Sequence, residues 1–149
     1  MVAKVESFCW VGADTSSTVA EDEGMVRSTW SALTKGLSPD DLALITTYRD
    51  FCRSLPGAQE EVTSSAVQYR GKRIFTSAYV KSHYLEIGVE LLREASHPKL
   101  RTSFATTKRI TMHRITVTTV AQVESAFDLI REACETVGPG VSPSRRTGR

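Results

Sequence analysis

The sequence lacks long hydrophobic runs, and no apolar stretch approaches the roughly 20 residues that a helix needs to cross a bilayer. The first residues also lack the charged start, apolar centre and small-residue cleavage site of a secretory signal. We therefore expect a cytoplasmic protein with no membrane partner.

Cysteine and histidine are also scarce. The three cysteines, Cys9, Cys52 and Cys134, are odd in number and show no CxxC spacing, so they predict neither a disulfide framework nor a zinc knuckle. The three histidines are scattered, and the sequence contains no HExxH motif, no phosphate-binding P-loop and no GxGxxG fingerprint. We accordingly expect no metal site and no cofactor.

The charges that are present are unevenly distributed. The net charge is only +2, but residues 1–69 hold five basic and ten acidic side chains, whereas residues 70–114 hold ten basic and three acidic ones. A basic segment of this kind either attracts anions or is neutralised by the acidic helices of the same chain. We favour neutralisation, because mixed charge is commonly compensated within one molecule.

Helical signals lie on both sides of a central block. Hydrophobic spacing predicts a short helix over residues 25–36, and Ser38 is placed to cap a second helix that runs to about residue 55. Thr119 and Gln122 have the capping-box spacing at the start of a third helix, which a Gly-Pro pair ends at residues 138–139.

Between these helices the hydrophobic period changes to two. Alternating apolar and polar residues predict four strands, and Gly71 provides a tight reversal between the first two. The strands are expected over residues 62–69, 73–81, 84–91 and 109–117. Residues 93–108 show no period and contain a proline, so we predict a long surface loop there.

These elements predict an α+β fold, in which two N-terminal helices and one C-terminal helix pack on an antiparallel sheet of about four strands. The chain length indicates a single domain over residues 25–138, after a flexible leader over 1–24 and before a disordered basic tail over 139–149. The expected core consists of Ile74, Leu85, Ile87, Val89, Ile115, Val117, Val123, Phe127 and Ile130.

Three stretches resemble a known family when they are taken in order. These are RIFTSAYVKSHYLEIGVELL, the His97-Pro98 pair, and MHRITVTTVAQVESAFDLIREAC. Together they resemble the bacterial family of unknown function numbered 5655, over roughly residues 25–138. The resemblance implies a small α+β domain with no established activity, and it places a histidine, here His113, at the opening of the last strand.

The leading functional hypothesis is a non-enzymatic binding or interaction domain. Arg73, Ser77, Tyr79 and Lys81 alternate on one strand face, where they make a polar patch that could hold an anionic ligand or a partner protein. The predicted 93–108 loop would lie beside this patch, and His113 is added as a ligand-binding candidate. An exposed edge strand could also support a homodimer. No catalytic residue is assigned.

Two alternatives remain open. Cations interleaved with aromatic residues on a sheet are typical of single-strand binders, so the basic half could bind nucleic acid. The residues of this alternative are Arg70, Lys72, Arg73, Lys81, Lys99 and Arg101, interleaved with Tyr69, Phe75 and Tyr79. A small hydrolase-like enzyme that uses His113 is the second alternative, and it requires an acidic group and a pocket beside the imidazole.

Overall fold

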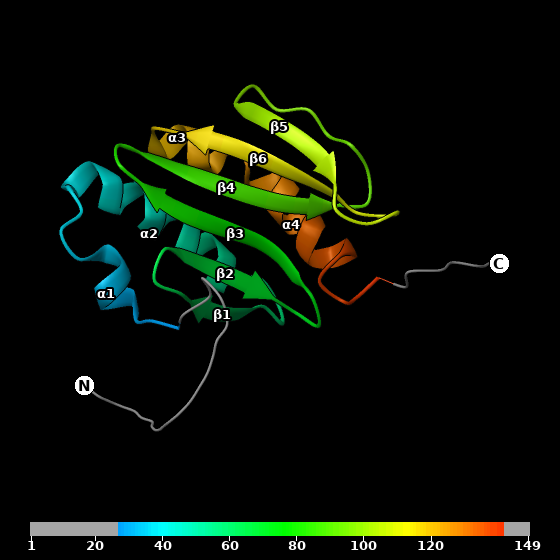
Figure 1. The fold of residues 1–149 in the computed structure, drawn as a ribbon, viewed down its shortest axis with the longest axis horizontal. Helices are drawn as coiled ribbons and strands as arrows, with labels where there is room; N and C mark the ends of the chain where they lie inside the picture. The colour runs from blue at the N-terminus through cyan, green and yellow to red at the C-terminus, as the bar shows by residue number, and fades with distance from the viewer. Residues whose placement is uncertain (1–26, 142–149) are drawn as a thin grey trace.

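The computed structural model describes residues 27–141 and shows an α+β fold built on a six-stranded antiparallel sheet (Figure 1). The strand order is β1-β2-β3-β4-β6-β5. The strands are β1 (Gln59–Val62), β2 (Ala66–Arg70), β3 (Ile74–Lys81), β4 (Tyr84–Leu91), β5 (Leu100–Ala105) and β6 (Thr111–Val117). The helices are α1 (Trp30–Thr34), α2 (Pro39–Arg53), α3 (Val120–Glu124) and α4 (Phe127–Thr136).

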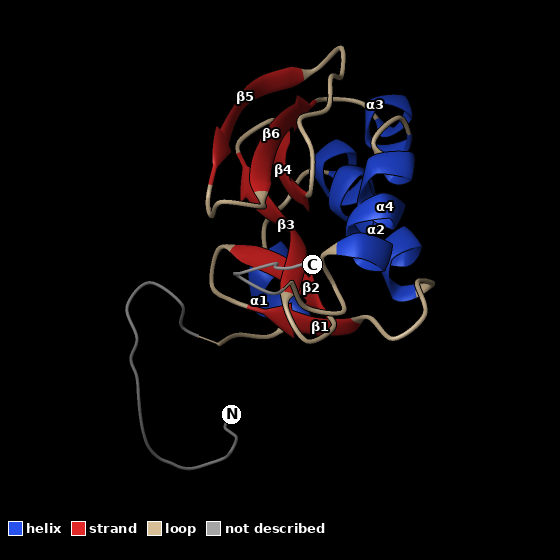
Figure 2. Cartoon of the chain, turned by 90° about the vertical axis from the view of Figure 1, so that its right-hand side faces the viewer, coloured by secondary structure: helices blue, strands red, loops and turns tan. Residues whose placement is uncertain are grey.

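The helices α2, α3 and α4 lie together on one face of the sheet (Figure 2). Buried residues of α2 and α4 pack against the apolar side chains that β3, β4 and β6 direct toward them, and these make up the core. On the opposite face, no helix within residues 27–141 covers the central strands, and we call this side the open face.

The helix starts follow from their capping residues. Ser38 accepts a hydrogen bond from the Asp41 amide at 3.1 Å, and Pro39 occupies the first position of α2. Thr119 accepts from the Gln122 amide at 3.2 Å, while the Gln122 side chain returns to the Thr118 amide at 2.7 Å. The capping box therefore forms with its second bond shifted by one residue.

The predicted architecture of about four strands and three helices is wrong. The stretch expected as one strand over residues 62–69 turns at residues 63–65, where β1 ends and β2 begins, and the stretch expected as a loop contains β5. Both missed strands lie at the edges of the sheet and are largely polar or exposed, so they lack the one-sided alternation of a half-buried strand. The C-terminal helix is also divided, because α3 ends at Glu124 and α4 begins at Phe127.

A register shift in β3 changes which side chains face the core. Tyr69 pairs with Thr76 but the next residue, Arg70, pairs with Ile74, so Phe75 is an extra residue on β3. As a result Phe75 and Thr76 both lie on the helix side, and Phe75 is completely buried. Alternation alone had placed Ile74 in the core, whereas its side chain lines the open face. The other expected core residues are buried, except that Phe127 is only partly so.

The predicted leader and tail lie outside the described residues, apart from residues 139–141, which follow α4.

The β2–β3 turn contacts the end of α4 closely. The Gly138 carbonyl accepts from the Lys72 amide at 2.8 Å and from the Arg73 amide at 3.3 Å. A Cβ added to Gly71 would lie 2.5 Å from the Gly138 oxygen, so only glycine fits at that position without displacing backbone.

We predict that Gly71→Ala lowers the free energy of unfolding by about 1–3 kcal/mol, because the added methyl group overpacks this contact. Urea denaturation monitored by circular dichroism measures the change. Lys72→Ala is the matched control, since it alters the same turn but leaves the amide that bonds to Gly138. Equal stability of Gly71→Ala and the wild type would contradict the close contact.

An ion-pair network joins α2 to the β1–β2 edge. The Glu60 carboxylate accepts from the Tyr69 hydroxyl at 2.7 Å and from Arg49 Nε and Nη2 at 2.9 and 3.1 Å, and the Arg49 guanidinium lies 4.1 Å above the Trp30 ring. Burial raises the pKa of Glu60, but the hydrogen bonds from Arg49 and Tyr69 outweigh it, so the net effect is a lowered pKa.

We expect Glu60→Gln to be less stable than the wild type by about 1–3 kcal/mol at pH 7, because it removes charge-assisted hydrogen bonds. The wild-type advantage is complete above the ordinary carboxyl pKa of 4.5 and disappears as the pH falls through the lower folded value. Unfolding curves between pH 7 and pH 2 test this. Glu124→Gln, at an exposed helix position, is the matched control and should be as stable as the wild type at pH 7.

Candidate functional site

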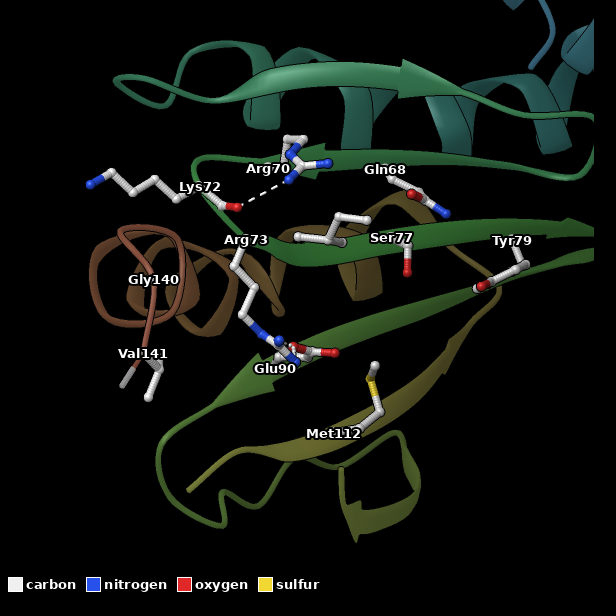
Figure 3. Close-up of a pocket in the computed structure, with 11 residues that line it drawn as sticks. Gln68, Arg70, Lys72, Arg73, Ser77, Tyr79, Glu90, Met112, Gly140 and Val141 are labelled. Atoms are coloured by element: carbon white, nitrogen blue, oxygen red, sulfur yellow. Dashed lines mark hydrogen bonds and ion pairs between the residues drawn. The ribbon is translucent and has the colours of Figure 1, made fainter. Parts of the chain in front are cut away.

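A cleft of about 590 Å³ opens on the open face of the sheet (Figure 3). Its volume is within the range of small-molecule sites. The residues that line it are Gln68, Arg70, Lys72, Arg73, Ile74, Ser77, Tyr79, Glu90, Met112, Gly140 and Val141. They come from four strands, from the β2–β3 turn and from the segment after α4, so distant parts of the sequence build one site.

The rim of the cleft is cationic and its floor is built of small or polar side chains. At one end Arg73 extends from the β2–β3 turn toward Glu90, while Lys72 extends from the same turn away from the other lining side chains, and Ser77 and Tyr79 follow along β3 (Figure 3). The floor stays open because Gly88 of β4 carries no side chain. A Cβ there would lie 3.3 Å from Met112 Sδ and 3.4 Å from Ser77 Oγ, so any larger residue would crowd the floor.

Three arginines of the open face are each paired with a glutamate. Arg73 donates to Glu90 Oε1 through Nε at 3.1 Å and lies 3.0 Å from it through Nη2. The other two pairs are Arg114 with Glu86 at 3.2 Å and Arg70 with Glu61 at 3.4 Å. These three arginines are matched by glutamates of the strands, whereas Arg93 is matched by a helix residue, Glu132 of α4, at 2.8 Å.

Three polar groups at the cleft remain without such partners. The Ser77 and Tyr79 hydroxyls form no hydrogen bond with any residue in the range 27–141, and Lys72 forms no ion pair there. Ser77 is only 8% exposed, so its hydroxyl has little access to water except from the cleft. A ligand in the cleft can therefore exchange a hydrogen bond with this hydroxyl in place of solvent.

The structure brings together three of the five predicted ligand-binding residues, Arg73, Ser77 and Tyr79. Lys81 lies at the end of β3, two residues beyond Tyr79 and roughly 25 Å from Arg73 at the usual rise per strand residue, and it does not line the cleft. His113 lies on the helix side of the sheet and is fully buried.

His113 is bonded to backbone on both sides of its ring. Nε2 accepts from the Ala95 amide at 2.8 Å, and Nδ1 lies 3.3 Å from the Val89 carbonyl. A neutral ring with its hydrogen on Nδ1 satisfies both contacts. The imidazole thus attaches the segment before β5 to the centre of the sheet, and no atom of it reaches the cleft.

The six residues of the nucleic-acid alternative do not form one patch. Arg70, Lys72 and Arg73 lie at the β2–β3 turn, whereas Lys99 and Arg101 lie at or beside β5. The strands β2 and β5 are four strand spacings apart, which is about 19 Å. Phe75 is buried beneath α4 rather than exposed for stacking. Tyr79 does lie on the open face, and Phe104 of β5 is 43% exposed there.

Sequence reasoning missed several lining residues. Glu90 alternates with the apolar residues of β4, so that pattern already placed it on the face opposite the core, where Arg73 was expected. Met112 and Gln68 gave no such signal. Their positions depend on the strand pairing, which sets Gln68 opposite Ser77 and Met112 opposite Glu90.

A second, smaller hollow lies on the helix side. It measures about 300 Å³ and is lined by Phe51, Ser54, Leu55, Pro56, Arg131, Cys134 and Glu135. Phe51 stacks on Phe127 with ring centroids 3.9 Å apart, and burial raises the pKa of the Cys134 thiol. A raised thiol pKa disfavours the reactive thiolate, so this hollow offers no activated nucleophile.

Within residues 27–141, no three histidine, cysteine or acidic side chains cluster in a way that could hold a metal ion. No helix in that range is long and apolar enough to span a membrane. Comparison of the chain with family models, with curated proteins and with solved structures gives no match. Membership of the family of unknown function therefore stays a prediction.

We predict that His113→Leu lowers the free energy of unfolding by about 1–3 kcal/mol, because it leaves the buried Ala95 amide without its acceptor. Hydrogen exchange should also accelerate at Ala95. His97→Leu is the matched control, since that ring also accepts a backbone hydrogen bond, from Lys99, but in an exposed loop. A larger loss of stability in His97→Leu than in His113→Leu would contradict the structural role.

Proposed function

We propose that this chain is a non-enzymatic binding domain that holds its ligand in the cleft on the open face. The observation that carries the proposal is the convergence of Arg73, Ser77 and Tyr79 on one concave site, with two hydroxyls that have no partner among the described residues. Concave sites with a few convergent polar groups and apolar walls are where small ligands bind.

Binding is favoured over catalysis by the positions and hydrogen-bond partners of Glu90 and His113. Glu90 is the carboxylate of the cleft, and its ion pair with Arg73 holds one of its oxygens. The histidine of the hydrolase alternative is enclosed on the other side of the sheet. Neither arrangement supports a general base directed at a bound substrate.

Nucleic-acid binding is the second candidate, supported by one observation. Phe104 is exposed on the open face, and the Arg114 guanidinium lies 5.5 Å from its ring centroid. An aromatic ring and a cation together can stack on bases. The pairing of Arg114 with Glu86 and the separation of the predicted cations place this candidate second.

The cytoplasmic location and the homodimer also remain proposals. Of the two sheet edges, β1 has four residues, and β5 carries a register shift at Arg101. Short edge strands, bulges and charges are the features that discourage edge-to-edge pairing. They favour a cleft, rather than a strand edge, as the binding surface of this domain.

We predict that 8-anilinonaphthalene-1-sulfonate binds the full chain with one saturable site and that Ser77→Phe weakens this binding at least tenfold, because the ring fills the floor. Fluorescence titration measures the affinity, and near-ultraviolet circular dichroism checks that the variant is folded. Thr102→Phe, which adds the same ring to β5 on the same face, should stay within twofold. Equal affinity of Ser77→Phe and the wild type would refute the cleft as the site.

A further inference from the structure

We infer that the ligand of the cleft is a small organic acid with one carboxylate on an apolar body. Its carboxylate lies at the Lys72 and Arg73 end, and its apolar part extends toward Met112 and Phe104. This inference rests on the proposed function, because it assigns a ligand class and an orientation to the same cleft.

The charge at the turn end suits a single negative group. Arg70 is engaged with its own turn, where it donates to the Lys72 and Gly71 carbonyls at 3.0 and 3.4 Å, and its charge is matched by Glu61. Arg73 is matched by Glu90 in the same way. Lys72 is left as the one unmatched cation among the described residues of the cleft.

Arg73 keeps a donor for the ligand despite its ion pair. It uses Nε and Nη2 on one oxygen of Glu90, while Nη1 has no partner within residues 27–141. Its side chain is 37% exposed, compared with 13% for Glu90, so the guanidinium covers the carboxylate. A ligand carboxylate entering the cleft therefore meets Arg73 before it meets Glu90.

The apolar surface runs from the cleft toward β5. Ile74, Met112 and Val141 line the cleft, and Met112 pairs directly with Phe104 across β6 and β5. Paired residues of antiparallel strands share a face, so the Phe104 ring continues the apolar surface of Met112. Phe104 is 43% exposed, with the Arg114 guanidinium 5.5 Å from its ring centroid, so part of the ring is open to a hydrophobic ligand group.

The same geometry disfavours a polyanion. A chain of phosphates laid across the sheet would pass the carboxylates of Glu90 and Glu86. Glu90 is partly buried and Glu86 is buried, and an arginine holds each of them. It would also have to span two separate groups of cations at β2 and β5. One carboxylate requires only the Lys72 and Arg73 end.

The test is a titration of the ¹⁵N-labelled full chain with 4-phenylbutyrate and with its neutral isostere, 4-phenylbutyramide, followed by amide chemical shifts. We expect the acid to shift signals of residues 72–79 and Met112 and to bind at least tenfold more tightly than the amide. Lys72→Gln should weaken the acid about tenfold, and Phe104→Ser about threefold. Lys108→Gln, a lysine of the β5–β6 turn outside the cleft, should stay within twofold of the wild type.

Equal binding of acid and amide, or no shift with either, would overturn the inferred ligand class. Displacement of 4-phenylbutyrate by an eight-residue oligothymidylate, with an affinity that falls steeply with salt, would overturn it in favour of nucleic acid. Tighter binding of an acetylated tetrapeptide with a free C-terminal carboxylate would overturn the small-molecule assignment. The proposed function is tested separately, by the binding of 8-anilinonaphthalene-1-sulfonate. It stands if Ser77→Phe weakens binding of this dye, and it fails if Ser77→Phe binds the dye as the wild type does, whatever the result with 4-phenylbutyrate.

Discussion

The register shift in β3 is the constraint on which both sides of the sheet depend. Because Phe75 is an extra residue, it enters the core together with Thr76, and the alternation restarts so that Ser77 and Tyr79 face outward. The Thr76 hydroxyl donates to the Gly88 carbonyl at 2.7 Å and lies 3.1 Å from the Tyr48 hydroxyl of α2. A buried hydrogen-bond chain thus joins helix, bulge and the strand beneath the cleft, so the floor is held from behind.

The cleft itself results from a row of small side chains across the sheet. Ser77 pairs with Gly88, and Gly88 pairs with Arg114, whose long side chain turns away toward Glu86 and Phe104. The row is therefore low in its middle, and the β2–β3 turn and the segment after α4 stand above it at one end. The Gly71–Gly138 contact brings these two walls together, which is why a turn and a helix end so far apart in sequence share one rim.

The elements of this fold that could be predicted are those with a local signal in the sequence. The apolar alternation of β4 and β6 and the capping residues Ser38 and Thr119 are local signals, and the structure keeps them. The edge strands β1 and β5 have too little apolar surface on either side to be recognised, and a bulge such as Phe75 looks like ordinary alternation until a partner strand is present. The hydrogen-bond partners of His113 could not be read from the sequence for a similar reason, because the backbone groups that bind it come from segments 18 and 24 residues away.

The charges show most clearly what sequence order conceals. Residues 70–114 carry a large excess of basic side chains, which sequence order alone assigns either to an anion-attracting surface or to charge neutralised within the chain. Strand pairing sets Glu90 beside Arg73 and Glu86 beside Arg114, and β1 adds Glu61 beside Arg70, so these three arginines are each matched by a glutamate. What remains at the cleft is one lysine, two hydroxyls and an apolar strip. A surface reduced to a single unmatched charge selects for the number of charges on its ligand, which a broadly basic surface does not.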